Sequence, residues 1–409
     1  MVTLTGTMTL GMLASTIYVP SIPSIAHALD TSIARVQFTF VGYLLAFAVS
    51  MLVLGPLSDR YGRRRTMIWG LVLSVVSSIA CAASPSIEFM IAARIIQGIG
   101  ACAGMVVGRA CIRDMYGRED AAQVIAGIAI AMTLVQSFAP IPGGYLDASI
   151  GWRANFVIVA VFAVVALGMA VRHVPETREA PSTQPQTAAR LAETMLRGYR
   201  SLIGARRFMA YALTATGSHA GFHIFAAGAP AVLISGFGVS PANYGYYASL
   251  PPIGFLLGSF ASNRLSRKLG TDLLIGIGSM VLIPGGSIMI ALAWMHIASP
   301  YIIVGPMVLV CCASGLITPN ALAGSLGVKA GIVGAASGLA SFMQMAGAAA
   351  ATAALSLGPG GNPVVLAVVI AGTGLFGVTA FAVLAQLSPV SARDESEAWS
   401  LVVHRGISH

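Results

Sequence analysis

The stretch Gly55-Pro-Leu-Ser-Asp-Arg-Tyr-Gly-Arg-Arg-Arg65 lies between two long apolar runs and decides how the rest of the chain is interpreted. Its two glycines, Gly55 and Gly62, permit close helix approach and a tight turn. Asp59 can accept hydrogen bonds from a helix N-terminus or from an arginine. A loop that only anchored the chain to lipid headgroups would need the arginines, but not the ordered pattern Gly-x-x-x-Asp-Arg-x-Gly-Arg-Arg.

The composition around this loop is that of a membrane protein. Of 409 residues, 56% are hydrophobic and only 9% are charged, whereas soluble proteins carry roughly 25% charged residues. This excludes a water-soluble enzyme and a disordered chain. The formal net charge of +9 would indicate nucleic acid binding in a soluble protein. Here the basic residues fall in loops on one side, so we expect contact with a lipid bilayer and none with nucleic acid.

Apolar runs separated by charged or Pro/Gly-rich segments predict twelve membrane-spanning helices. An even number of spans places both termini on the same side of the membrane. We expect the helices at about 2–22, 34–56, 67–84, 87–109, 121–146, 152–171, 208–229, 243–262, 272–294, 300–320, 335–356 and 364–386.

A polar, Pro-rich stretch divides the twelve helices into two groups of six. It contains Pro175, Pro181 and Pro185 and has the composition of a linker, not of a thirteenth span. Two such groups joined by a linker are typical of transporters built from parallel repeats. We therefore expect an N-terminal bundle (1–171), a linker (172–207), a C-terminal bundle (208–386) and a tail (387–409).

The distribution of Lys and Arg predicts the orientation. Of the 23 Lys and Arg residues, all but Arg35, Arg94 and Arg153 fall on the side of the linker. Loops rich in Lys and Arg stay in the cytoplasm. The sequence therefore predicts a multi-pass inner-membrane protein with both termini in the cytoplasm.

Several motifs resemble those of a known family. The loop Gly55–Arg65 resembles the signature loop of the major facilitator superfamily. Other segments are similar to the drug:proton antiporter branch, in particular the bicyclomycin/chloramphenicol resistance transporters. These segments are Thr16-Ile-Tyr-Val-Pro-Ser-Ile-Pro23, Arg94-Ile-Ile-Gln-Gly-Ile-Gly100, Arg109-Ala-Cys-Ile-Arg-Asp114, Ala139-Pro-Ile-Pro-Gly-Gly144, Pro319-Asn320 and Ala336-Ser-Gly-Leu with Gln344.

The resemblance spans nearly the whole chain and implies an all-α major facilitator fold of twelve transmembrane helices in two six-helix bundles. It also implies secondary active export of small amphipathic compounds, that is, multidrug efflux and antibiotic resistance by proton antiport. One departure bears on the coupling ion. Where many relatives place a membrane-embedded acid in the first helix, this chain has Thr16, which cannot titrate.

Arg94 is a functional candidate because a charged residue within a span is costly to bury. It lies about seven residues, or roughly 10 Å, inside its helix, and Gln97 follows on the same face. One interpretation assigns Arg94 to substrate binding or coupling. The other is an arginine that binds backbone carbonyls at a kink.

His219 and His223 are spaced to share one face of a helix near the membrane midplane. Histidine changes charge near neutral pH, so this pair could replace the missing acid as the proton carrier. A metal site with a third ligand and a neutral interhelical hydrogen bond are the alternatives. Further candidates for substrate binding are polar residues of spans that form the central cavity in the family: Thr16, Tyr18, Gln37, Tyr43 and Gln344.

Two other sets of residues are expected to control the conformational cycle. A cytoplasmic gate is predicted in which Asp59 meets Arg109 or Arg113, together with the positive N-terminal end of the eleventh helix, when the inner side is closed. Prolines and glycines near the external end of the fifth span would bend that helix. The gate set is Gly55, Asp59, Arg60, Gly62, Arg63, Arg64, Arg109 and Arg113, and the hinge set is Pro140, Pro142, Gly143 and Gly144.

The sequence contains no catalytic or nucleotide-binding motif, so we expect neither an enzyme nor a cofactor. The energy would then come from the proton gradient or from the solute gradient. We expect a monomer that binds a small-molecule substrate. An uptake carrier or facilitator for a metabolite is the alternative function, and a non-transporting membrane receptor is a further one.

Overall fold

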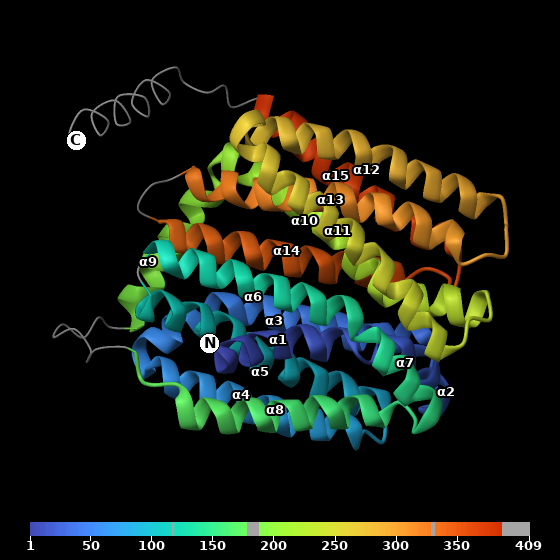
Figure 1. Cartoon of the computed structure of the whole chain (residues 1–409), viewed down its shortest axis with the longest axis horizontal. Coiled ribbons are helices and arrows are strands. Elements are labelled where there is room, and N and C mark those ends of the chain that lie inside the picture. The colour runs from blue at the N-terminus through green and yellow to red at the C-terminus, as the bar shows by residue number, and fades with distance from the viewer. Residues whose placement is uncertain (117, 178–187, 329–331, 387–409) are drawn as a thin grey trace.

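A computed structural model of the chain describes residues 1–116, 118–177, 188–328 and 332–386. Figure 1 shows long helices lying side by side, and the regular structure of the described residues is entirely helical. A helix satisfies its own backbone hydrogen bonds, which is what a chain this apolar requires in lipid. The predicted tail 387–409 lies outside the described residues.

The chain forms two groups of helices, which we call the N-terminal half and the C-terminal half. The N-terminal half consists of α1 (Val2–Thr16), η1 (Val19–Ser21), α2 (Ile22–Ala28), α3 (Ile33–Tyr61), α4 (Arg63–Ala82), α5 (Ile87–Met115), α6 (Arg118–Phe138), α7 (Pro140–Ser149) and α8 (Arg153–His173). The C-terminal half consists of α10 (Arg206–Pro230), η2 (Ala231–Gly236), α11 (Pro241–Leu269), α12 (Thr271–Trp294), α13 (Tyr301–Gly327), α14 (Val333–Ser356) and α15 (Pro363–Gln386).

Eleven helical segments of the described chain are long and apolar enough to cross a membrane. The predicted helix 243–262 is present as α11 but is not among the eleven. It is 29 residues long, and its first turns carry Asn243 and three tyrosines while its last turns carry Arg264 and Lys268. These polar residues leave no sufficiently apolar stretch of membrane length in α11.

The helices extend beyond the limits predicted from hydropathy. The span predicted at 34–56 continues as α3 to Tyr61, and the span predicted at 87–109 continues as α5 to Met115. Hydropathy identifies the apolar part of a helix, whereas polar turns continue it into water. α3 ends because Gly62 adopts φ +97°, a conformation that favours glycine.

The predicted linker 172–207 is more ordered than its composition indicated. It contains an additional helix, α9 (Ala188–Ile203), in which Leu202 is fully buried and Tyr199 lies near Gly338 of α14. A polar composition identifies a segment outside the membrane, but it does not exclude an amphipathic helix that packs on the bundle surface.

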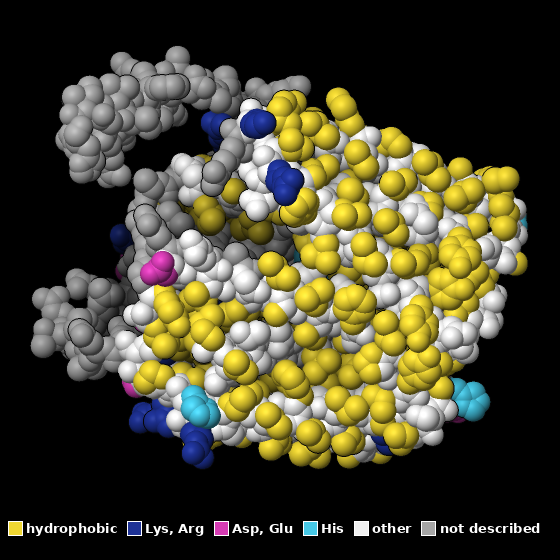
Figure 2. Space-filling view, in the orientation of Figure 1, with side chains coloured by type: hydrophobic (Ala, Val, Ile, Leu, Met, Phe, Trp, Pro, Cys, Tyr) yellow, Lys and Arg dark blue, Asp and Glu magenta, His cyan; other side chains and the backbone are white. Residues whose placement is uncertain are grey.

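The two halves meet along α3 and α14 and along α7 and α11. We call the end of the molecule that carries Arg63, Arg64, Arg65 and α9 the basic end, and the other end, where α2 and α7 lie in Figure 1, the opposite end. Figure 2 shows hydrophobic side chains over much of the visible surface and a hollow between the halves toward the basic end.

Candidate functional site

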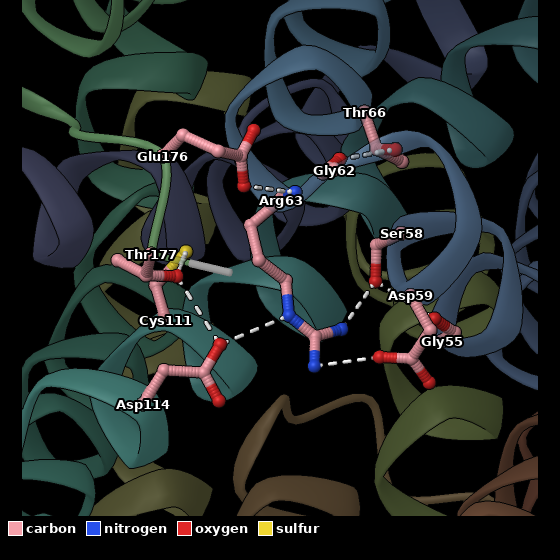
Figure 3. Close-up of polar contacts among 10 residues, drawn as sticks. All are labelled: Gly55, Ser58, Asp59, Gly62, Arg63, Thr66, Cys111, Asp114, Glu176 and Thr177. Atoms are coloured by element: carbon pink, nitrogen blue, oxygen red, sulfur yellow. Dashed lines mark hydrogen bonds and ion pairs between the residues drawn. The ribbon is translucent and has the colours of Figure 1, made fainter. Parts of the chain in front are cut away.

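The signature loop is organised by Arg63, the first residue of α4 (Figure 3). Its guanidinium forms ion pairs with Asp59 (2.6 Å) and Asp114 (3.1 Å) and donates to the Ser58 hydroxyl (2.7 Å). Its side chain is only 13% exposed, so these charges are partly shielded from water. One arginine thereby connects the end of α3 with the end of α5.

Two residues that follow α8 complete this network and were not identified in the sequence. Glu176 Oε1 accepts a hydrogen bond from the Arg63 backbone N–H at 2.8 Å, at the start of α4. The Thr177 hydroxyl donates to Asp114 Oδ2 at 3.1 Å. An acid directly after a span, on the side rich in arginine, is the signal that could have indicated Glu176, since a carboxylate is favourable at a helix N-terminus.

The predicted gate pairs are arranged differently. The structure pairs Asp59 with Arg63, whereas Arg109 lies against the sulfur of Met105 at 3.8 Å and Arg113 is exposed. Arg63 is four residues after Asp59 across a tight turn, so it reaches the carboxylate without movement of either half. The predicted pairing of Asp59 with Arg109 or Arg113 is therefore not the arrangement of this conformation.

The other members of the gate set have separate surroundings. Arg60 lies over the Tyr61 ring at 5.4 Å, and Arg64 donates to the Val171 carbonyl at 2.6 Å. A side chain at Gly62 would collide with Glu176, whereas no atom lies within 4 Å of the position a Cβ would take at Gly55. The close helix approach predicted for Gly55 is thus absent in this conformation.

Arg94 is fully buried within the N-terminal half, although it is charged. Its guanidinium carbon lies 4.3 Å from the centre of the Tyr18 ring and 4.3 Å from that of the Tyr43 ring. Its Nη1 donates to the Ala14 carbonyl at 2.9 Å and to Gln97 Oε1. We call Arg94, Tyr18, Tyr43 and Gln97 the arginine cage.

The cage stands where the first span is interrupted. α1 ends at Thr16, and the chain passes through η1 before it continues as α2. The bond from Arg94 to Ala14 is the geometry of the second interpretation made from the sequence, an arginine on a carbonyl at a kink. Thr16 is 3% exposed, and its hydroxyl donates to the Met12 carbonyl at 2.8 Å.

The two predicted histidines of α10 lie in contact. His219 Nε2 and His223 Nε2 are 3.2 Å apart, so one ring nitrogen donates and the other accepts. His223 also lies 6.0 Å from the Phe40 ring of α3, across the boundary between the halves. Within the described part of the chain, no group of three or more His, Cys, Asp or Glu side chains could hold a metal ion.

At the opposite end, the two halves are in close contact. The fifth span breaks between α6 and α7 after Ala139, at Pro140. Beyond the break, a Cβ on Gly144 would lie well inside the van der Waals distance of the Pro241 carbonyl of α11. Gln37 of α3 donates to the Ala227 carbonyl of α10 at 3.1 Å. These contacts close the opposite end, where Pro142 and Gly143 also lie.

The opposite end contains a further link that sequence reasoning missed. The hydroxyls of Tyr145 and Tyr246 are 2.9 Å apart, and this hydrogen bond is exposed. We expect Tyr145→Phe to change the transport rate in proteoliposomes by no more than about fivefold, because a single exposed hydrogen bond contributes roughly 1 kcal/mol. Tyr61→Phe, at the basic end, is the matched control. Complete loss of transport in Tyr145→Phe would show that this pair controls closure.

Gln344 is the remaining predicted substrate-site residue. It lies on α14, is 6% exposed, and its side-chain Nε2 has no hydrogen-bond partner. A buried amide N–H without a hydrogen-bond partner costs free energy. The Gln344 amide can therefore donate to a ligand or a water molecule.

The arrangement of the two halves identifies the class of protein. Two helical halves are closed against each other at one end, separated by a hollow toward the other, and carry buried polar groups between them, which is the architecture of a secondary transporter. Residues 4–352 match the Major Facilitator Superfamily. The chain belongs to this family, whose members are transporters and not enzymes.

Two relatives named as resistance proteins match most of the chain. It is 27% identical over 337 residues to Multidrug resistance protein D of Escherichia coli (strain K12), covering 82% of this chain and 83% of the relative. It is 30% identical over 277 residues to a chloramphenicol resistance protein of Pseudomonas aeruginosa, covering 68% of this chain and 64% of that protein.

Solved structures show the same fold at low sequence identity. An inward-facing, unoccupied bacterial homologue of the human lysosomal transporter Spinster superposes with a TM-score of 0.72 at 17% identity, covering 94% of this chain and 95% of that one. A D-xylose–proton symporter gives a TM-score of 0.73 at 15% identity, covering 92% and 96%. The predicted major facilitator fold is confirmed.

Proposed function

We propose that this protein exports small amphipathic compounds, including antibiotics, from the cytoplasm by alternating access. The observation that carries the proposal is the closure made by α7 on α11. The antiporter-like segment Ala139–Gly144 breaks the fifth span, and Gly144 approaches the Pro241 carbonyl closely. The relatives named as multidrug and chloramphenicol resistance proteins support the same direction of transport.

The orientation follows from the basic residues. We place the basic end in the cytoplasm of the inner membrane, with both termini there, because loops rich in Lys and Arg stay inside. The hollow of Figure 2 would then open to the cytoplasm, and we assign this conformation to an inward-facing state. We also propose that the unit of transport is the monomer and that the two bundles, 1–171 and 208–386, rock against each other around the site.

Export is tested by expression in a bacterium that lacks its own efflux pumps. We expect raised tolerance to several amphipathic antibiotics and lower cellular accumulation of a fluorescent substrate. Increased uptake of a metabolite would support the carrier alternative, and neither effect would favour the receptor. The carrier alternative has one observation in its favour: Thr16, in the first span, cannot carry a proton and already donates to a backbone carbonyl.

For proton coupling, we propose the histidine pair of α10. The two rings contact each other, and His223 lies close to Phe40 across the boundary between the halves, so a proton on this pair would alter that boundary. We expect the double variant His219→Gln with His223→Gln to lose substrate-driven proton flux in proteoliposomes while it still binds substrate. His173→Gln, exposed at the basic end, is the control. Full proton flux in the double variant would contradict this assignment.

A further inference from the structure

The arginine cage holds a positive charge that no ion pair of the described residues balances. Arg94 is fully buried, and no ion pair among the described residues includes it. A charge in a low-dielectric interior is costly unless it is paired and hydrogen-bonded. The aromatic rings of the cage offset part of this cost, but they carry no negative charge.

The acidic side chains of the N-terminal half that form polar contacts are engaged elsewhere. Glu88 pairs with Arg35 at 2.6 Å, and Asp114 pairs with Arg63 at 3.1 Å. Asp147 accepts from the Ser24 hydroxyl at 2.6 Å. The phenols of the cage are also engaged, Tyr18 with the Thr39 hydroxyl at 3.2 Å and Tyr43 with the Gly11 carbonyl at 2.8 Å.

The unused part of the guanidinium has a specific shape. The guanidinium carbon lies 4.3 Å from each of the Tyr18 and Tyr43 rings, and Nη1 already donates to the Ala14 carbonyl and Gln97. The two nitrogens without a partner are Nε and Nη2. These two N–H groups lie on the same edge of the guanidinium and point in nearly parallel directions, which matches the two oxygens of a carboxylate.

We infer that Arg94 binds the carboxylate of a monoanionic, amphipathic substrate through its Nε–Nη2 edge. The inference rests on the proposed transport function and names a substrate class for it. A planar oxyanion fits two parallel donors better than a spherical halide does, and the surrounding rings of Tyr18, Tyr43 and Phe156 suit an apolar body.

The cage is connected to the boundary between the halves through α3. The cage is sealed in this conformation, and its wall continues into the closure of the opposite end. Tyr18 bonds to Thr39 of α3, and the neighbouring Gln37 and Phe40 contact Ala227 and His223 of α10. Movement of α3 relative to α10 would therefore act on the helix that carries Tyr43 of the cage.

The test uses the purified full-length protein in lipid nanodiscs and three probes of matched shape: 2-naphthylacetate, 2-naphthylacetamide and 2-naphthylethylamine. Calorimetric titration measures each dissociation constant. We expect the carboxylate to bind at least about tenfold more tightly than the amide, because charge-assisted bidentate bonds are about twice as strong as neutral ones. Equal affinities, or no binding of the carboxylate, would overturn the inference whether or not any variant folds.

Variants of Arg94 then test whether this residue binds the carboxylate. In Arg94→Gln the preference for the carboxylate should disappear, and in Arg94→Lys, which keeps the charge but lacks the paired donors, it should weaken. Wild-type affinity in Arg94→Lys would contradict bidentate binding. Addition of chloride to a sulfate buffer should leave carboxylate binding unchanged. Competition by chloride would show that the occupant is an inorganic anion and would also overturn the inference.

Export assays separate this inference from the proposed function. If neutral and cationic antibiotics are exported equally by wild type and Arg94→Gln, and naphthylacetate does not bind, the export function stands and the carboxylate site fails. If naphthylacetate binds through Arg94 but no compound is exported, the site stands and the export function fails.

Discussion

Gly144→Val should slow transport by about tenfold or more, because it opposes closure of the opposite end. A Cβ at this position would overlap the Pro241 carbonyl, which belongs to the backbone of α11 and cannot move aside as a flexible side chain can. Overpacking of this kind costs roughly 1–3 kcal/mol. Because 1.4 kcal/mol changes a two-state ratio about tenfold, we expect the closed population and the transport rate to fall by about tenfold or more.

The measurement combines initial transport rates in proteoliposomes with distances between spin labels at exposed positions of the opposite end. Ile150→Cys in the N-terminal half and Met295→Cys in the C-terminal half provide such positions, being 75% and 65% exposed. The label distance should increase in Gly144→Val. The matched control is Gly127→Val on the same span, where no atom lies within 4 Å of the added Cβ. Unchanged distances and normal transport in Gly144→Val would refute the role assigned to this contact.

Arg63→Ala should have the second largest effect. The substitution removes the cation shared by Asp59 and Asp114 and the donor to Ser58, but it keeps the backbone N–H that bonds to Glu176. Two carboxylates, 49% and 29% exposed, would then lack this partner. Hydrogen bonds to charged groups contribute about 1.5–3 kcal/mol each when shielded and less when exposed. We therefore expect a loss of about 1–3 kcal/mol.

This loss should appear as a lower apparent melting temperature of the purified protein and as a transport rate reduced by about tenfold. Arg65→Ala is the matched control. Arg65 is exposed and lies on the same turn, so its substitution removes the same charge without removing the contacts of Arg63. If both variants behave alike, the effect comes from the basic charge of the loop and not from the contacts of Arg63. High salt should reduce the difference, since the ion pairs are partly exposed.

The helical membrane fold was predictable because it depends on composition and on local order. The apolar runs predicted the segments that became α3, α5 and α8, and the break after Ala139 coincides with a Pro-Ile-Pro segment that cannot continue a regular helix. The helix ends were less predictable. Hydropathy follows the lipid boundary, whereas α3 continues through Ser58 and Asp59 until the positive φ of Gly62 ends it.

Motif residues were predictable as candidates, and their partners were predictable where both lie on one helix. The spacing placed Arg94 and Gln97 on one face and His219 and His223 on another, and those pairs are in contact. Asp59 was expected to meet Arg109 or Arg113 when the inner side is closed, and in this conformation it pairs with Arg63. The choice among several nearby arginines depends on helix rotation and on the turn geometry, which periodicity does not determine.

The sequence by itself determined the membrane class, the helical spans and the asymmetry of basic residues, because each depends on the transfer of side chains between lipid and water. Only the tertiary structure decided which groups meet. Ala14 and Arg94, Gly144 and Pro241, and Arg63 and Glu176 are each brought together from segments far apart in the chain. Contacts of this kind depend on how each helix is rotated and how closely it approaches its neighbours. All the helices packed around it together set that rotation and distance.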